Sequence, residues 1–126
     1  MTTTVAPSET LDRRSAVRVG TIVIARHGEP HADRTVRIDH RAYRDWWADY
    51  DRSELHPDEK PPQTLLDLAA KSDVIFSSTL PRAMHTAAML AGGRHVVTDP
   101  EFVDAPLPPP PIRGRRRPNQ WGLWAR

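Results

Sequence analysis

Between residues 19 and 104, short apolar runs typical of strands alternate with segments of helical periodicity. Few folds have strands and helices in this order. Residues 21–25 are a β-branched run of the kind that forms a strand covered on both faces. Residues 74–76 are a second such run, and residues 95–98 are a third, weaker one. Strands that alternate with helices predict an α/β fold with a mostly parallel sheet.

The first helical pattern follows the first apolar run. Asp39 is a suitable N-cap for a helix that reaches about Arg52. Four aromatic residues would share one face of this helix: Tyr43, Trp46, Trp47 and Tyr50. A short second helix is expected to turn three residues inward: Leu65, Leu68 and Ala69.

A third helix is expected after the second apolar run. Pro81 suits its first position, Ser78 or Thr79 is a candidate cap, and the pattern reaches about residue 91. Gly92 and Gly93 suit the point at which such a helix ends.

The two ends of the chain differ from this central part. Residues 1–18 are rich in Thr, Ser and charge, which predicts a flexible lead-in. Residues 105–126 carry five arginines and no acid, and five prolines between 106 and 111 exclude a helix there. Those five arginines leave 13 basic against 16 acidic residues in the rest of the chain, so the formal charge of +2 comes from the tail.

Composition excludes some classes of protein. The chain has no cysteine, which excludes a disulfide scaffold and thiolate metal sites. No apolar run approaches the roughly 18 residues that cross a bilayer, and residues 1–10 lack the order of a secretory signal. We therefore expect a soluble cytoplasmic protein.

Two polar segments follow the first two apolar runs. The first contains, in order, Arg26, His27, Gly28 and Glu29. The second contains Ser77 and Ser78, and Arg82 follows in the first turn of the expected helix. Ligands of open parallel sheets bind beyond the carboxyl ends of the strands, and arginine and helix N-termini attract phosphate. The alternative is a polar histidine at a strand end and a solvated arginine at a helix start.

Together these segments resemble the histidine phosphatase superfamily, also called the phosphoglycerate-mutase-like family. The matching residues of the second segment are Ser77, Ser78, Arg82, Ala83, Thr86 and Ala87. Gln63 also stands where members often carry Gln. The resemblance covers residues 20 to about 104, and more loosely the rest. It implies a three-layer α/β/α fold with a mostly parallel sheet.

The resemblance also implies a phosphatase or phosphotransferase. His27 would attack the phosphoryl group and form a phosphohistidine. The phosphate-binding residues would be Arg26, Glu29 and Arg82. Asp104, or alternatively Glu101, would protonate the leaving oxygen and later activate water. Neither a metal nor an organic cofactor is implied, and the substrate would be a small phosphomonoester or a phosphoprotein.

The sequence departs from the family in three ways. No histidine follows His95, whereas members carry a second active-site histidine before a glycine. Asp33 stands where mutase-type members often have Asn, and an acid there would repel phosphate unless protonated or turned away. The chain stops at Arg126, before elements that the fold normally adds, so we expect a C-terminally truncated domain with poor stability and a tendency to self-associate.

Two alternatives remain open. One is a catalytically impaired fragment or pseudoenzyme that binds phosphate without turning it over. The other, less favoured, is a nucleic-acid binder that uses residues 113–117 together with Trp121 and Trp124. For that tail we favour an arginine-rich loop followed by the start of a helix.

Overall fold

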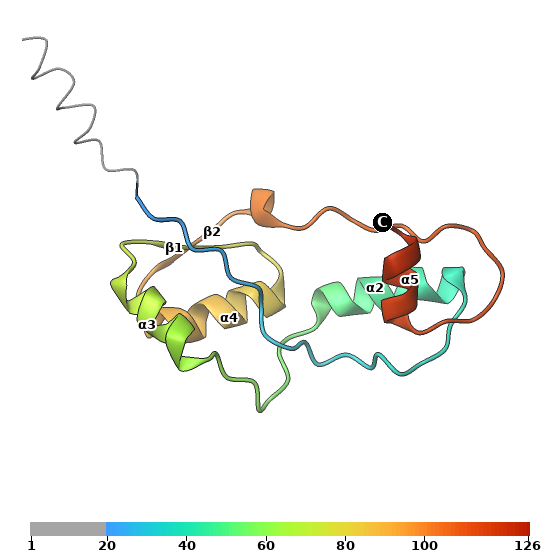
Figure 1. Ribbon diagram of the computed structural model, residues 1–126, viewed down its shortest axis with the longest axis horizontal. Helices are drawn as coiled ribbons and strands as arrows, with labels where there is room; N and C mark the ends of the chain where they lie inside the picture. The colour runs from blue at the N-terminus through green and yellow to red at the C-terminus, as the bar shows by residue number, and fades with distance from the viewer. Residues whose placement is uncertain (1–19) are drawn as a thin grey trace, which may run out of the picture.

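The computed structural model describes residues 20–126, so the predicted lead-in, residues 1–18, lies outside the described residues. The molecule is elongated, with the sheet and the helices Gln63–Lys71 and Pro81–Ala91 at one end, and the helices His40–Arg52 and Pro118–Trp124 at the other (Figure 1). Its elements are α2 (His40–Arg52), α3 (Gln63–Lys71), β1 (Ile75–Ser77), α4 (Pro81–Ala91), β2 (Val96–Thr98), the 3-10 helix η1 (Pro100–Phe102) and α5 (Pro118–Trp124).

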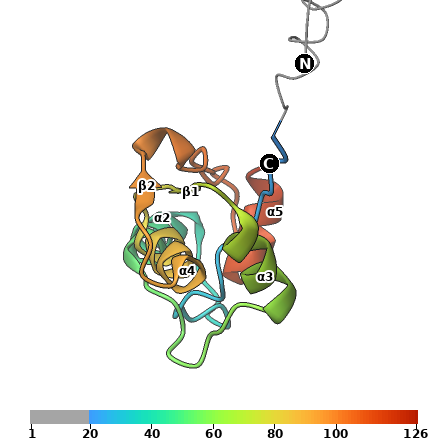
Figure 2. The same cartoon turned by 90° about the vertical axis from the view of Figure 1, so that its left-hand side faces the viewer.

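The two strands form a parallel pair joined through α4. Ile75 lies opposite Val96, and Ser77 lies opposite Thr98. Both strands lie on the same side of α4, which contacts each of them (Figure 2). This β1–α4–β2 unit confirms the predicted α/β class and the parallel pairing.

Only one face of the sheet is covered by a helix in the described part of the chain. Phe76 points to the other face, is 55% exposed, and packs against Phe102 with 5.7 Å between ring centroids. Ile75 and Ser77, which alternate with Phe76 along β1, are more buried. The described residues therefore form a sheet with one α-helix, α4, packed on one face.

The strand predicted at residues 21–25 is absent. This segment has no regular structure and makes no backbone hydrogen bond to β1. Ile22 is 85% exposed and Ile24 is 92% exposed. A parallel strand is stable when apolar groups cover both of its faces, and the single helical layer over β1 and β2 does not provide that cover.

Helix α4 begins at Pro81 and ends before Gly92, as predicted. Gly92 has φ of 56°, a left-handed conformation that favours glycine at a helix end. The predicted cap at Ser78 or Thr79 is wrong. Leu80 is the N-cap, with extended backbone and no side-chain cap. Pro81 imposes that extended backbone on the residue before it, and the Leu80 carbonyl accepts the first free N–H groups instead.

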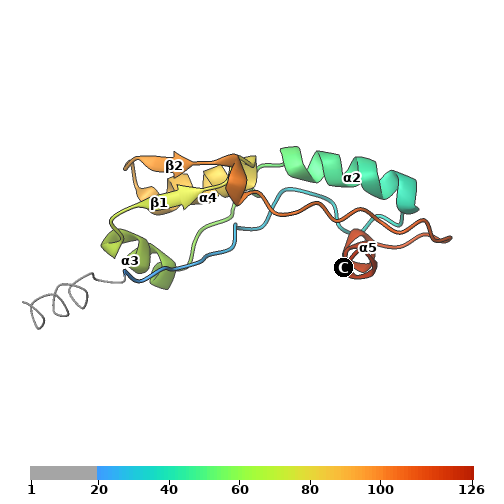
Figure 3. The same cartoon turned by 90° about the horizontal axis from the view of Figure 1, so that it is seen from above.

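Helix α2 confirms both its predicted cap and its predicted aromatic face. The Asp39 carboxylate accepts a hydrogen bond of 2.8 Å from the Ala42 amide. Tyr43 stacks on Trp121 of α5, which lies beside α2 (Figure 3). Trp121 is 0% exposed, and its indole N–H donates to the Ile38 carbonyl at 2.7 Å. These aromatic contacts form the core at this end of the molecule.

Helix α3 partly follows its prediction. Ala69 is buried and Leu65 is half-buried, as expected. Leu68 is exposed, so its predicted inward orientation is wrong. The reason is that α3 packs on one side only, against α4, which accommodates a narrow apolar stripe.

The arginine-rich segment is fastened to the residues before α2. Residues 106–111 are not helical and α5 follows, both as predicted. Ile38 and Arg116 exchange both backbone hydrogen bonds, and the Arg115 Nε–H donates to the Arg37 carbonyl. The Arg116 guanidinium lies over the ring of Trp121 at 5.0 Å. Within residues 20–126, no helix has the length and apolar character needed to cross a membrane.

Candidate functional site

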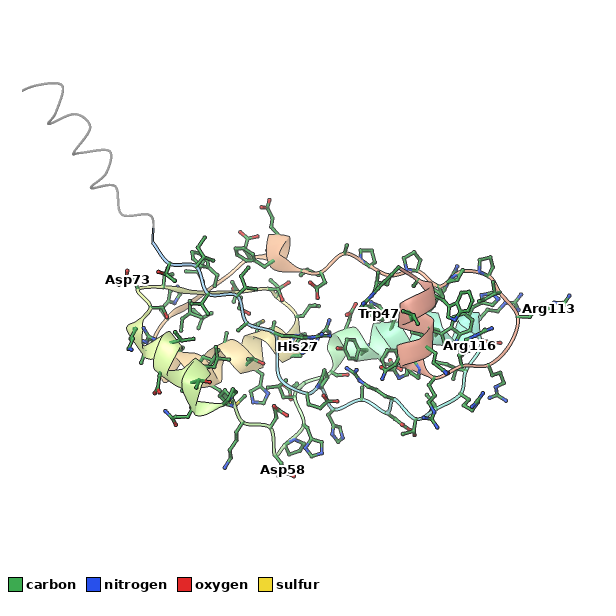
Figure 4. The ribbon with its side chains drawn as sticks, in the orientation of Figure 1. His27, Trp47, Asp58, Asp73, Arg113 and Arg116 are labelled. Carbon is green, nitrogen blue, oxygen red and sulfur yellow. The ribbon has the colours of Figure 1, made fainter. Side chains whose placement is uncertain are left out.

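His27 lies at the junction between the first turn of α4 and the last turn of α2 (Figure 4). The residues that follow it are anchored by an antiparallel pairing. The His31 amide donates to the Glu54 carbonyl, and the His56 amide donates to the Glu29 carbonyl, each at 2.8 Å. This pairing fixes the chain on the C-terminal side of His27.

The two imidazole nitrogens of His27 have different partners. Nδ1 lies 2.8 Å from the Gly28 carbonyl oxygen, which can only accept, so the ring proton belongs on Nδ1. Nε2 lies 3.3 Å from the Arg82 Nε, which can only donate. Nε2 therefore carries the lone pair and faces a cation.

The pKa of His27 lies below its usual value of 6.5. Burial of the ring is the main cause, and the positive charges of Arg82 and Arg26 lower the pKa further. The Gly28 carbonyl and the negative charge of Asp104 oppose the shift. The balance favours a neutral imidazole at neutral pH, which is the nucleophilic form.

Arg82 is buried and paired. It is 3% exposed, and its NH1 donates to the Tyr50 carbonyl at 3.1 Å. NH1 and NH2 each donate to the same oxygen of Asp51, at 3.2 Å. The guanidinium also lies 4.3 Å from the centroid of the Tyr50 ring. The alternative of a solvated arginine at a helix start is therefore wrong.

Gly28 and Thr86 join the two sequence segments. The Gly28 amide donates to the Thr86 hydroxyl at 3.0 Å, and that hydroxyl donates to the Arg82 carbonyl at 2.8 Å. A Cβ on Gly28 would lie 2.6 Å from the Glu59 Cγ, which explains why a glycine fits here. The predicted meeting of the two segments is thus realised, although residues 21–25 form no strand.

The remaining predicted site residues lie at the exposed rim. Arg26 and Asp104 are exposed, and the charge of each acts on His27. Glu29 is also exposed, and its carboxylate lies 3.9 Å from the Arg34 Nε. Glu101 lies in η1, where its amide donates to the Asp99 carboxylate. Of the two candidate acids, Asp104 is the one whose negative charge raises the pKa of His27.

Asp33 is turned toward its own loop. Its carboxylate accepts from the Thr35 amide at 2.8 Å and from the Thr35 hydroxyl at 2.6 Å. These two hydrogen bonds lower the pKa of Asp33, so the carboxylate is ionised but occupied. A hollow of about 310 Å³ beside it is lined by Glu29, Pro30, His31, Ala32, Asp33 and His56.

Sequence reasoning missed Asp51 and gave Tyr50 only a packing role. A signal existed in the charges at the two helix ends. Arg82 in the first turn of α4 and Asp51 in the last turn of α2 each oppose the dipole of their own helix. The two unfavourable placements compensate each other when the ends meet, as they do here at 3.2 Å.

Comparison with protein-family models, with curated proteins and with solved structures finds no match for this chain. The function therefore has to be argued from the geometry of residues 26–29, 51, 82, 86 and 104.

Proposed function

We propose that this chain is a phosphatase or phosphotransferase of the histidine phosphatase type, which acts on a phosphomonoester or a phosphoprotein through a phosphohistidine. The observation that carries the proposal is the arrangement of His27. Its Nδ1 donates to the Gly28 carbonyl, and its Nε2 lone pair faces the Arg82 Nε–H. A fixed tautomer whose Nε2 lone pair lies beside a buried cation suits attack on phosphorus.

In the first step, a phosphoryl oxygen takes the Arg82 Nε–H in place of the His27 nitrogen. The Nε2 lone pair then forms a bond to phosphorus as the bond from phosphorus to the leaving oxygen breaks. Arg82, with Arg26 at the rim, stabilises the charge on the phosphoryl oxygens. The Gly28 carbonyl keeps the proton on Nδ1, so the ring does not rotate as its charge increases.

In the second step, water attacks phosphorus and the bond to Nε2 breaks. Asp104 takes part in both steps. In the first step its acid form gives a proton to the leaving oxygen, and in the second step the resulting carboxylate accepts a proton from the attacking water. Glu101 is equally exposed, so the assignment rests on the effect of the Asp104 charge on the pKa of His27. No metal ion is needed, because the two arginines supply the positive charge.

The proposal also carries the finer expectation of a three-layer α/β/α arrangement with a mostly parallel sheet. Two features support it. Phe76 presents an apolar side chain on the open face of the sheet, and residues 22–24 are apolar and exposed.

The test is hydrolysis of an aryl phosphate by the whole chain and by His27→Ala. Brief reaction followed by denaturation in alkali preserves a phosphohistidine, which mass spectrometry can locate. We expect phosphorylation at His27, and loss of both phosphorylation and turnover in His27→Ala. His85→Ala is the matched control, because His85 is an exposed residue of the same helix as Arg82. Equal turnover by the His27→Ala chain would refute the proposal.

A second candidate function is phosphate binding with little turnover. The observation that favours it is the occupied state of Arg82, whose NH1 and NH2 already donate to Tyr50 and Asp51. On this alternative, inorganic phosphate binds to the chain and binds less well to Arg82→Ala, while no phosphohistidine forms. Titration of phosphate by calorimetry separates this alternative from the first proposal.

A further inference from the structure

The hydrogen-bond donors of Arg82 divide into two edges. A guanidinium has five N–H groups in one plane. NH1 and NH2 donate together to one oxygen of Asp51, which occupies the end of the guanidinium. The other NH1 hydrogen goes to the Tyr50 carbonyl. The Nε–H and the second NH2 hydrogen lie on the side edge, and the Nε–H donates to His27 Nε2 at 3.3 Å.

The plane of that guanidinium is fixed from three directions. Asp51 binds its end, the Tyr50 ring lies against its face at 4.3 Å, and the Tyr50 carbonyl accepts from NH1 at 3.1 Å. Arg82 is 3% exposed, so its orientation is set by protein groups and not by solvent. A buried cation that loses its partner anion seeks another one, so the orientation of Arg82 depends on Asp51.

The Asp51 carboxylate is only partly occupied by Arg82. Its side chain is 39% exposed, and only one of its oxygens contacts Arg82. It lies in the last turn of α2, which is fixed to the rest of the molecule through the Tyr50 carbonyl and ring. The carboxylate is therefore placed by a rigid helix rather than by a loop.

We infer that Asp51 is a positioning residue, which occupies the end edge of Arg82 and so directs the side edge, Nε–H and NH2, toward the phosphoryl group at His27. The inference rests on the proposed function, and it adds the way in which the phosphate is gripped. Two phosphoryl oxygens bind the side edge in parallel, one to Nε–H and one to NH2, while Asp51 keeps its place. Asp51 and the substrate thus share one guanidinium.

The experiment compares Asp51→Asn, Asp51→Ala and the matched control Asp49→Asn in the whole chain. Asp49 is a neighbouring acid on α2 that pairs with Arg52 in solvent. The first readout is the exchange rate of the Arg82 Nε–H with water, measured by nitrogen-15 NMR without ligand. We expect slow exchange in the unsubstituted chain and in Asp49→Asn, and much faster exchange in Asp51→Ala.

The second readout separates kcat from KM for an aryl phosphate. We expect kcat to fall roughly a hundredfold in Asp51→Ala, the size of effect that misplacement of a reacting group causes, with little change in KM. Inorganic phosphate, which binds as a ground-state anion, should bind as well as before or better, because the end edge of Arg82 is released. Asp51→Asn should restore part of kcat, since its amide oxygen still accepts one hydrogen bond.

Two results would overturn the inference. One is slow Arg82 Nε–H exchange in Asp51→Ala, and the other is an equal loss of inorganic phosphate affinity and kcat, which would show that Asp51 supports ground-state binding of the anion. The exchange measurement needs no catalysis, so it decides the role of Asp51 even in a chain that forms no phosphohistidine. Failure of the proposed function is seen separately, as turnover that survives His27→Ala. If Asp51→Ala does not fold, the same readouts on Asp51→Asn decide the matter.

Discussion

The Gly28 amide donates a hydrogen bond to the Thr86 hydroxyl, and this contact fixes the backbone next to His27 against α4. The same hydroxyl donates to the Arg82 carbonyl one turn earlier in the helix. A single side chain thus ties the histidine segment to the turn that carries the arginine.

Replacement of Thr86 by valine keeps the shape of the side chain and removes the hydroxyl. The Gly28 amide then lacks an acceptor in a partly buried place, which costs about 1–3 kcal/mol of unfolding free energy. We also expect lower kcat for an aryl phosphate, because the His27 backbone is released. Denaturant titration and steady-state kinetics measure the two effects. Thr64→Val, at an exposed position of α3, should change neither.

Formation of the proposed phosphohistidine should depend on pH through His27. Burial lowers the pKa of His27 from its usual value of 6.5, so the ring stays neutral at a lower pH than a free histidine does. We expect kcat/KM to fall on the acid side with an apparent pKa below 6.5, and NMR titration of the His27 ring to give the same value. An acid limb at or above 6.5 would contradict the burial argument.

The same shift has a consequence for stability. The unfolded chain binds a proton at His27 at a higher pH than the folded chain does, because the pKa of His27 is lowered on folding. The unfolding free energy should therefore fall as the pH drops from about 6.5 toward the lower pKa of the folded His27 ring. In His27→Ala this contribution to the pH dependence should disappear, as measured by denaturant titration at several pH values.

Trp121 should be the largest single contributor to stability at the α2–α5 end. It is fully buried against Tyr43 and bonds the Ile38 carbonyl. Trp121→Ala should cost about 3–5 kcal/mol of unfolding free energy, because it leaves a large cavity. The exposed Trp124 provides the control, and Trp124→Ala should have a small effect. Equal losses in the two variants would show that α5 does not pack as described.

The apolar residues 22–24 should make the chain associate. Ile22 and Ile24 lie almost fully in solvent, close in sequence to the candidate site. Sedimentation velocity should detect oligomers of the unsubstituted chain, and Ile22→Ser with Ile24→Ser should shift the distribution toward the monomer. A single monomeric species for the unsubstituted chain at high concentration would show this expectation to be wrong.

Local signals predicted the helices and the parallel pair well. Pro81, Gly92 and Asp39 act within a few residues of the ends that they mark, so their effect can be read from the sequence. The strand at residues 21–25 failed for the opposite reason. Its apolar residues form a stable strand only when other apolar groups cover both of its faces. The described residues do not cover Ile22 and Ile24 in this way.

The candidate site was predicted in its main pair and missed in its support. His27 and Arg82 were expected to meet because both follow apolar runs, and they lie 3.3 Å apart. Asp51 could not be found in the same way, since it belongs to a helix whose end meets α4 only in three dimensions. Its charge at the end of α2, together with that of Arg82 at the start of α4, was the local sign of that meeting.

The contacts that define the site span long stretches of sequence. Gly28 and Thr86 are 58 positions apart, and His27 and Arg82 are 55 positions apart. Each contact closes a loop whose entropic cost is met only when the intervening chain is in place, so the candidate site should be assembled late in folding. The appearance of a shielded His27 ring during refolding would then mark completion of the native structure rather than an early helical intermediate.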